Sequence, residues 1–273
     1  MRSTPRPQEN ADEAVRLVKE AAGAGATYVQ TPEITNICQR RKAEAEPLVT
    51  TEENEPVLAA LRGVAAEAGI HVHIGSLVVR DGAKWANRSF LIAPDGSVAA
   101  RYDKIHMFDV DLPDGDRYRE SDTYTPGETA VLAPVGEATL GLSICFDLRF
   151  PRLYEALAME GADVVAAPAA FTAVTGAAHW HLLVRTRAVE NGVFVVAAAQ
   201  EGLHEDGRRT YGHSLVVDPW GRILAEATGT PSVIVADLDL SQVGLVRAQV
   251  PVLTARRGFS LARVEPSAKR TAS

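Results

Sequence analysis

Two pairs of matching segments, in the same order in each half of the chain, constrain its fold more than any other feature of the sequence. Residues 25–32 and 161–168 both run from a glycine through a short strand-like stretch to a proline. Residues 89–96 and 214–221 both run from a serine through an apolar stretch to a turn that ends in glycine. Such units recur by chance in some chains, but two units in the same order favour a pseudo-symmetric domain. Each half then supplies one sheet with helices on its outer face, and the apolar inner faces pack as a four-layer α-β-β-α sandwich of the α/β class.

Hydrophobic periodicity and turn residues divide the chain into helices and strands. Apolar residues at helical spacing predict helices over residues 10–24, 56–68, 151–160 and 180–191. Asn10 or Asp12 is expected to cap the first of these helices. Strands are predicted over residues 26–31, 70–79, 87–93, 97–102, 138–144, 163–167, 193–199, 214–217, 221–227 and 232–237.

Composition and charge exclude several classes of protein. The 273 residues carry 28 Lys and Arg against 35 Asp and Glu, a net charge of −7, so no nucleic-acid partner is expected. Two cysteines argue against a disulfide framework and favour a cytoplasmic location. The most apolar region, residues 161–178, is interrupted by Asp163 and Pro168 and is not a membrane span, so no membrane partner is expected. We expect one domain over residues 1–264 and a disordered tail over residues 265–273.

Cys145 is the first candidate for chemistry. It follows an apolar strand and precedes a proline that opens a predicted helix, so a turn there lifts the thiol out of the sheet. Amides at a helix N-terminus are expected to lower the thiol pKa and to stabilise an oxyanion. A buried core cysteine is the alternative, because cysteine is among the most buried residue types. Arg149, four residues further on, favours a thiolate or an anionic ligand beside it.

Two charged residues share with Cys145 a position just after a predicted strand. Glu33 follows the strand of residues 26–31, and Lys104 follows that of residues 97–102. Each alone is typical of a solvated surface, but strand ends in layered α/β folds meet at one rim, where sites form. A cysteine–histidine pairing stays open among the seven histidines. They complete no metal site with cysteines or carboxylates in the sequence pattern, so we expect neither a metal nor an organic cofactor.

Three ordered segments make the chain resemble a known family. Residues 32–33, 103–106 and 145–151 are similar to the signature segments of the nitrilase superfamily, the carbon–nitrogen hydrolases. The resemblance extends over residues 3–257 and implies a Glu–Lys–Cys catalytic set on an α-β-β-α sandwich. Further segments resemble the Nit branch of amidases. Residues 211–221 look most like deaminated glutathione amidases, with the omega-amidases, which act on alpha-ketoglutaramate, as close relatives.

The resemblance assigns roles to individual residues. Glu33 matches the general base, Lys104 the catalytic lysine and Cys145 the nucleophile. Glu120 matches the second glutamate of these amidase sites. Glu128 competes with it by proximity but stands in a Pro-Gly-Glu stretch typical of a turn, so it ranks lower.

Three further residues complete the predicted site. The backbone N–H of Phe146 joins the catalytic lysine as an oxyanion donor. Arg149 is the candidate to bind a substrate carboxylate, because a guanidinium pairs with one bidentately, and Thr172 adds a hydroxyl donor. An ion pair of Arg149 with Asp147 or Glu155 is the alternative for that arginine.

The implied reaction is hydrolysis of a small primary amide that carries a carboxylate, to the acid and ammonia, through a cysteine thioester. A deaminated glutathione amidase is the first expectation and an omega-amidase the second. Nitrile or N-carbamoyl hydrolysis on the same fold is a further alternative. A non-enzymatic binding role is disfavoured by the intact Glu–Lys–Cys set. A homodimer or higher homo-oligomer is expected.

The start of the chain departs from the family pattern. Family members open with an apolar strand that ends in Gln-Met, whereas this sequence begins at the Met. Pro5 and Pro7 rule out a central strand before Asn10. We therefore expect the natural chain to begin about eight residues before Met1. Without that strand, neighbouring backbone groups lose their partners, a sheet edge opens and the inner face near Glu33 is uncovered.

Overall fold

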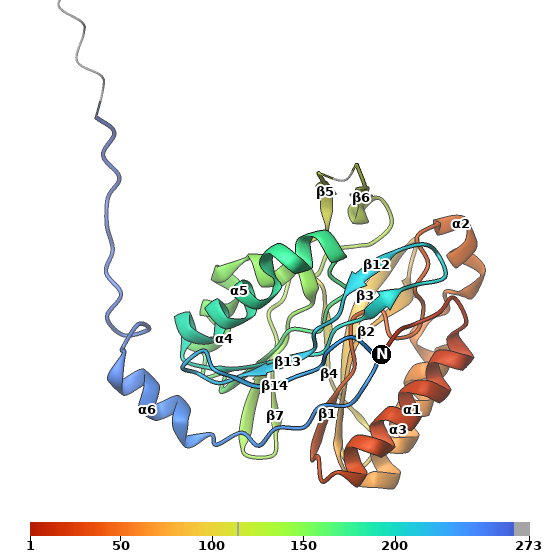
Figure 1. Cartoon of the computed structure of the whole chain (residues 1–273), viewed down its shortest axis with the longest axis horizontal. Helices are drawn as coiled ribbons and strands as arrows, with labels where there is room; N and C mark the ends of the chain where they lie inside the picture. The colour runs from red at the N-terminus through yellow and green to blue at the C-terminus, as the bar shows by residue number, and fades with distance from the viewer. Residues whose placement is uncertain (114, 265–273) are drawn as a thin grey trace, which may run out of the picture.

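Two β-sheets lie face to face in the computed structural model, which describes residues 1–113 and 115–264 (Figure 1). The first sheet has the order β1-β2-β3-β4, and the second has the order β14-β13-β10-β9-β8-β7. The strands of the first sheet are β1 (Tyr28–Gln30), β2 (His71–Asp81), β3 (Lys84–Ile92) and β4 (Val98–Asp103). Those of the second sheet are β7 (Leu132–Val135), β8 (Ala138–Gly141), β9 (Val164–Ala166), β10 (Phe194–Ala197), β13 (Leu215–Val217) and β14 (Ile223–Glu226).

Both sheets contain parallel and antiparallel strand pairs, and the pairing in the first sheet is similar to that in the second. The strand that follows the first helix, β1, runs parallel to β2, and β8, β9 and β10 run parallel at the centre of the second sheet. The other neighbours in the two sheets pair antiparallel. The long pair β2–β3 extends from Val72 opposite Ile92 to Asp81 opposite Lys84, with one irregularity on the way.

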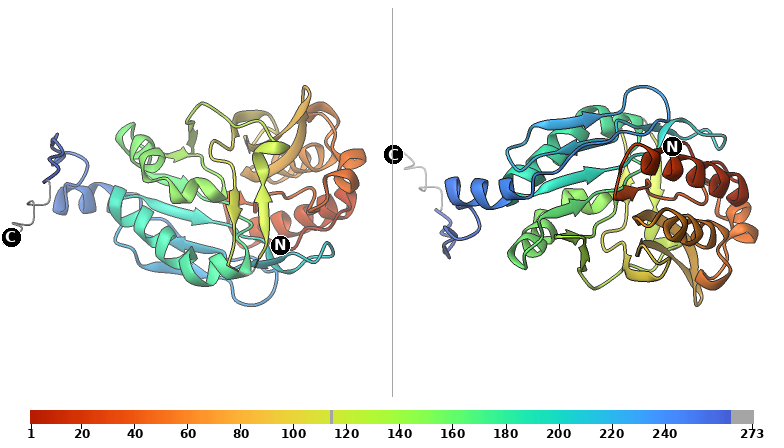
Figure 2. Two further views of the ribbon diagram at one scale, coloured as in Figure 1. Left: turned by 90° about the horizontal axis from the view of Figure 1, so that it is seen from above. Right: turned by 90° about the horizontal axis from the view of Figure 1, so that it is seen from below.

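Helices cover the outer face of each sheet. The helices α1 (Pro7–Gly23) and α3 (Pro56–Ala68) share a buried apolar cluster with β2 and β3. The helices α4 (Pro151–Met159) and α5 (Ala173–Asn191) pack on the second sheet, on the opposite side of the molecule (Figure 2). Leu91 and Tyr102, from the first sheet, belong to the same buried cluster as the second sheet, so the two inner faces meet. The predicted α-β-β-α sandwich is confirmed.

The helix ends follow local chemistry. In α3, Pro56 occupies the first turn, the carboxylate of Glu55 accepts the N–H of Leu58, and Gly69 ends the helix with φ 65°. The first helix begins at Pro7 and not at residue 10. Asn10 therefore lies inside α1 and does not cap it; its side chain instead bonds the backbone of Thr4 and of Asn36.

Smaller elements surround the sandwich. Two hairpins are formed by β5 (Asp109–Asp111) with β6 (Arg117–Arg119), and by β11 (Glu201–Leu203) with β12 (Arg209–Tyr211). The remaining helical elements are α2 (Lys42–Ala45), α6 (Ser241–Gln249), η1 (Glu46–Leu48), η2 (Glu52–Asn54), η3 (Glu120–Asp122) and η4 (Cys145–Arg149). None of the helices in the described ranges has the length and apolar character needed to span a bilayer. The predicted tail, residues 265–273, lies outside the described residues.

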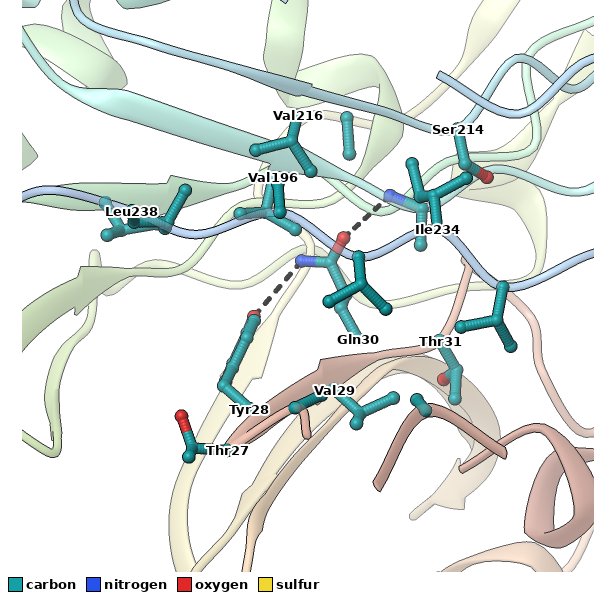
Figure 3. Close-up of a pocket in the computed structure, with 18 of the residues that line it drawn as sticks. Thr27, Tyr28, Val29, Gln30, Thr31, Val196, Ser214, Val216, Ile234 and Leu238 are labelled. Carbon is teal, nitrogen blue, oxygen red and sulfur yellow. Dashed lines mark hydrogen bonds between the residues drawn. The ribbon is translucent and has the colours of Figure 1, made fainter. Parts of the chain in front are cut away.

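The strand predicted over residues 232–237 is not formed. That segment enters no ladder, and β1, which it faces, is the edge strand of its sheet. A cavity of about 530 Å³ separates the two (Figure 3). Figure 3 shows Val29 on one wall, with Ile234 and Leu238 on the other. An apolar alternation alone does not make a strand where no neighbouring backbone is within hydrogen-bonding reach.

The side chain of Gln30 links the two sheets across this cavity. Its Oε1 accepts the N–H of Ala198 at 2.7 Å, and its Nε2 donates to the hydroxyl of Tyr28 at 3.3 Å (Figure 3). The cavity reaches Pro32 but not Glu33, whose exposed fraction is 5%. The inner face is therefore open along β1 as far as Pro32, the residue before Glu33, while Glu33 itself is buried.

Gly75 lies where the two halves of the chain meet. A Cβ on this residue of β2 would stand 2.1 Å from the carbonyl oxygen of Thr31, 2.6 Å from that of Pro32 and 2.5 Å from Cβ of Pro168. The two prolines are the ends of the matched segments. Only glycine lets both approach the sheet so closely.

Gly75→Ala is therefore expected to lower the free energy of unfolding by about 2 kcal/mol or more, because backbone on both sides must move. Gly63→Ala in α3, where an added Cβ meets nothing within 4 Å, is the matched control and is expected to raise it by up to ~1 kcal/mol. Urea denaturation measures both. Equal midpoints for the two variants would contradict the close approach at Gly75.

Candidate active site

The predicted site residues meet in one cleft of about 230 Å³. Chain segments that follow strands carry them: Glu33 follows β1, Lys104 follows β4, Glu120 begins η3 after β6, and Cys145 begins η4 after β8. The cleft is also lined by Phe146, Arg149 and Thr172. The prediction that residues which follow strand ends gather at one rim of the sandwich is therefore consistent with this cleft.

Lys104 lies between two carboxylates. Its Nζ is 2.9 Å from Oε1 of Glu33 and 3.0 and 2.9 Å from the two carboxylate oxygens of Glu120. The exposed fraction of the lysine is 2%. Burial on its own lowers the pKa of Lys104, but the charges of Glu120 and Glu33 outweigh it and raise the pKa well above its ordinary value. The ammonium is therefore charged throughout the physiological range.

Glu33 is an ionised carboxylate held by several donors. Its Oε1 also accepts Nδ2 of Asn87 at 2.9 Å, and its Oε2 accepts the backbone N–H of Ala170 at 2.9 Å. Burial raises the pKa of Glu33, but the Lys104 charge and hydrogen bonds, including one from Cys145, bring it below its ordinary value. In this state Glu33 is unprotonated and able to accept a proton.

Cys145 adopts a backbone conformation that is uncommon for a residue with a side chain. Its φ is 48°, and its N–H donates to the carbonyl of Pro168 at 2.8 Å. The thiol and the carboxylate of Glu33 line the same cleft and influence each other's ionisation. Burial and the Glu33 charge raise the pKa of Cys145 well above its ordinary value, although Lys104 opposes them. The expectation of a lowered thiol pKa is wrong, because burial, and after it the adjacent carboxylate, raise the pKa more than Lys104 and the backbone of Ala170 lower it.

Asp147 fixes the turn that carries the cysteine, a role that the sequence reasoning missed. This fully buried carboxylate accepts the N–H of Ile144 at 2.9 Å and the hydroxyl of Tyr102 at 2.7 Å. It also accepts the backbone N–H of His106 at 3.0 Å and contacts its Nδ1 at 2.7 Å. The signal in the sequence is an Asp two residues after the candidate nucleophile, placed to cap its own turn.

Asn87 also escaped the sequence reasoning. Its amide nitrogen bridges Oε1 of Glu33 at 2.9 Å and Oε1 of Glu120 at 3.2 Å. A polar residue inside the predicted strand of residues 87–93 is a weak signal, because half-buried strands carry such residues routinely.

The two candidates for the second glutamate are placed very differently. Glu120 contacts Lys104, and its Oε2 accepts the N–H of Phe108 at 2.6 Å. Glu128 is exposed and does not line the cleft.

The backbone N–H of Phe146 is available to a ligand. It lies in the first turn of η4, where amides have no partner within the helix. Across residues 1–113 and 115–264, no backbone carbonyl accepts this N–H. Phe146, Lys104 and Cys145 line the same cleft.

Arg149 forms no carboxylate ion pair within the described residues. Its guanidinium lies 5.1 Å from the ring centroid of Phe171 and 5.9 Å from that of Phe146. Its Nη1 contacts Nδ1 of His179 at 3.2 Å. The alternative of a pair with Asp147 or Glu155 is not formed; those carboxylates bond other groups, among them Tyr102 and Arg256.

Thr172 lines the cleft, but its hydroxyl has a structural use. Its Oγ1 accepts the N–H of Thr175 and so caps α5. This cap explains why α5 begins at Ala173, seven residues before the predicted start of that helix.

One group of side chains outside the cleft has the donor set of a metal site. The imidazoles of His181 and His213 both bond Oε1 of Glu226, at 2.9 and 2.8 Å, and one ligand atom from each residue lies within 4.8 Å of the others. None of the three lines the catalytic cleft. These hydrogen bonds satisfy the three side chains and hold α5 against β14.

Comparison with known proteins adds to this geometry. The family model described as carbon–nitrogen hydrolase matches residues 1–248. Over 262 residues the chain is 40% identical to a deaminated glutathione amidase of Synechocystis, a match that covers 94% of this chain and 95% of that protein. It is 36% identical to the omega-amidase NIT2 of Xenopus tropicalis, over 93% of this chain and 91% of the other. The crystal structure of the Caenorhabditis elegans NitFhit protein superposes with a TM-score of 0.87 and 34% identity, over 94% of this chain and 63% of that one.

The charge states in the cleft predict how the thiol titrates. We expect the midpoint of Cys145 ionisation to lie above its ordinary value of 9.0, and Glu33→Gln to move it downward, because a negative neighbour that disfavours the thiolate is removed. Ultraviolet absorbance of the thiolate reports it. The titration uses the Cys38→Ser protein, with Cys38→Ser/Cys145→Ser subtracted to remove the tyrosine signal. A midpoint below 9.0, or an upward shift in Glu33→Gln, contradicts the assigned charge states.

Proposed function

The chain belongs to the carbon–nitrogen hydrolase family, and on this premise we propose that it is a cysteine amidase in which Glu33 is the general base. The observation that carries this proposal is the contact of one buried ammonium, that of Lys104, with two carboxylates beside the thiol of Cys145. The ammonium leaves Glu33 ionised and able to take the thiol proton. The same ammonium faces the position where negative charge develops on the substrate.

The first half of the reaction forms a thioester. Glu33 takes the proton of the Cys145 thiol while the sulfur attacks the amide carbonyl carbon. The carbonyl π electrons move onto oxygen, and the Lys104 ammonium with the N–H of Phe146 stabilises the oxyanion. Glu33 then gives its proton to the amide nitrogen. The carbon–nitrogen bond breaks, and the neutral amine or ammonia departs.

The second half hydrolyses the thioester. A water molecule gives one proton to Glu33 and attacks the acyl carbon, so the same two donors stabilise a second oxyanion. The carbon–sulfur bond breaks as the proton returns from Glu33 to the sulfur. The carboxylic acid leaves, and Cys145 is again a neutral thiol, which is its state in the free site.

The substrate is proposed to carry a carboxylate on the acyl side of the scissile bond. Arg149 lacks an acidic partner and lies on two aromatic rings at the cleft, so its guanidinium suits a carboxylate, with Thr172 beside it. Deaminated glutathione is the first candidate and alpha-ketoglutaramate the second, in line with the names of the relatives. The leaving group depends on which is cleaved: glutathione without its amino group contains only secondary amides and releases an amine, whereas a primary omega-amide releases ammonia.

We further propose a cytoplasmic homo-oligomer. Both cysteines are free, as in a reducing compartment. Large apolar side chains are exposed on neighbouring helices, namely Met159 at the end of α4 with Leu182 and Val189 on α5. Size-exclusion chromatography with light scattering tests the assembly.

Side-by-side kinetics test the proposed reaction. The protein is expected to hydrolyse deaminated glutathione to an acid and an amine, and alpha-ketoglutaramate to an acid and ammonia, both measured by chromatography. Cys145→Ala is expected to lose at least about three decades in kcat while its circular dichroism is unchanged. Turnover of a nitrile or an N-carbamoyl compound in place of these amides, or activity in the folded Cys145→Ala variant above a few per cent, contradicts the proposal.

Two glutamate variants test the second carboxylate. Glu120→Gln is expected to lower kcat/KM by roughly 10–100-fold, because Lys104 and the N–H of Phe108 lose a charged partner. The control Glu128→Gln, on an exposed residue in the same chain segment, is expected to stay within about twofold of the parent. The opposite order of effects would assign the role to Glu128.

A further inference from the structure

Arg208 contributes a mostly buried guanidinium to the catalytic cleft, with no carboxylate oxygen of a described residue at hydrogen-bonding distance. It follows the turn of the β11–β12 hairpin, and 17% of its side chain is exposed. Its Nε is buried and makes no hydrogen bond to any described residue. The nearest carboxylate oxygen, Oδ2 of Asp206, is 3.7 Å from its Nη2, and that oxygen is itself buried without a hydrogen bond.

This arrangement is unusual because burying a guanidinium N–H without a hydrogen bond is unfavourable, and Nε of Arg208 is in that state. Other arginines that line the cleft have carboxylates at hydrogen-bonding distance. These pairs are Arg40 with Asp116 at 3.0 Å, Arg117 with Asp111 at 3.1 Å and Arg119 with Asp111 at 2.9 Å. Arg208 and Arg149 are the two cleft arginines, within the described ranges, that lack such a partner.

The backbone around Arg208 is held firmly, so its position is not that of a loose surface loop. The hairpin docks on the cleft wall, where the N–H of Tyr211 donates to the carbonyl of Phe171 at 2.9 Å. The N–H of His204 donates to the carbonyl of Arg208 at 2.8 Å, and the N–H of Arg208 donates to Oδ1 of Asp206 at 2.9 Å. The donors are therefore presented before any ligand arrives.

The two unmatched arginines belong to different walls of the cleft. Arg149 comes from η4 and lies over Phe146 and Phe171. Arg208 comes from the hairpin and is within Coulombic reach of Tyr118 and Tyr124, which line the cleft as well. A ligand that satisfies both guanidiniums carries two anionic groups.

We propose that Arg208 is a second anion subsite, which binds a carboxylate of the substrate distant from the one bound by Arg149. The inference rests on the proposed function and sharpens it to amides that carry carboxylates on both sides of the scissile bond. Deaminated glutathione has such a second carboxylate, at its glycine end, on the leaving-group side. Alpha-ketoglutaramate has none there, so Arg208 favours the longer substrate.

Binding to a protein that cannot react gives the direct test. In the Cys145→Ala protein, calorimetry compares deaminated glutathione with its C-terminal carboxamide, which lacks only the distal charge. We expect the dianion to bind at least about thirtyfold more tightly, the effect of one buried charged pair. Arg208→Gln is expected to reduce this preference to less than about threefold and to leave the affinity for the carboxamide nearly unchanged.

Two further variants keep the test decisive. Arg117→Gln removes a charge from the same cleft, at an exposed residue that already has a partner, and is expected to retain the preference. Arg208→Lys preserves the charge without the bidentate fork and is expected to lose part of the preference, which covers the case of an unfolded Arg208→Gln.

The outcomes separate the inference from the proposed function. If the parent shows no preference for the dianion, or if Arg208→Gln or Arg208→Lys keeps it in full, Arg208 serves only its contact with Asp206 and the inference is overturned. If the preference is present and depends on Arg208 but the intact enzyme cleaves neither amide, the anion subsite stands and the proposed reaction fails.

Discussion

The buried contact of one ammonium with two carboxylates is the interaction on which the rest of the site depends. Removing a lysine and two glutamates from water is strongly unfavourable unless each charge finds its partner in the same place. The partners come from three separate parts of the chain, after β1, after β4 and after β6. The fold must therefore bring both ends of the first sheet and the β5–β6 hairpin together before the ammonium meets the two carboxylates. In that arrangement Lys104 is an ammonium, Glu33 is ionised and Cys145 is a neutral thiol.

The same sandwich geometry ties the nucleophile to the base. The two matched segments end in Pro32 and Pro168, which approach each other across Gly75. Glu33 follows the first proline directly. The carbonyl of the second accepts the N–H of Cys145, and two residues further on the N–H of Ala170 donates to Glu33. The internal repeat is thus more than a sign of ancestry or symmetry, because its two ends hold the reacting groups together.

Sequence reasoning predicts best where the cause is local. Residues 56–68 form a helix with the predicted bounds, because Pro56 and Gly69 act on their own backbone. The failures have distant causes. Residues 232–237 alternate like a strand, but pairing needs a neighbour that lies within reach, and here a cavity takes that place. The Asn87 contact with Glu33 spans 54 residues, and the bond of Asp147 with Tyr102 spans 45, so of these contacts only the local cap that Asp147 makes with Ile144 leaves a sign in the sequence. The prediction of a lowered thiol pKa fails for the same reason, since Glu33, which helps to raise that pKa, is 112 positions from Cys145 in the sequence.

The net charge of the whole chain and the cationic side chains of the cleft have opposite effects on an anionic ligand. A net charge of −7 repels anions, and Glu33 with Glu120 places two further carboxylates at the reaction centre. An anionic amide reaches that centre only if cations are concentrated along its path. The side chains that line the cleft include those cations: Arg40, Lys42, Lys104, Arg117, Arg119, Arg149 and Arg208. Arg40, Arg117 and Arg119 form ion pairs with aspartates outside the cleft, which weakens their attraction for an anionic ligand. The cations that line the cleft without a carboxylate of the described residues at hydrogen-bonding distance, Lys42, Arg149 and Arg208 among them, are left to attract an anion, and the two guanidiniums are therefore the groups proposed to bind substrate carboxylates.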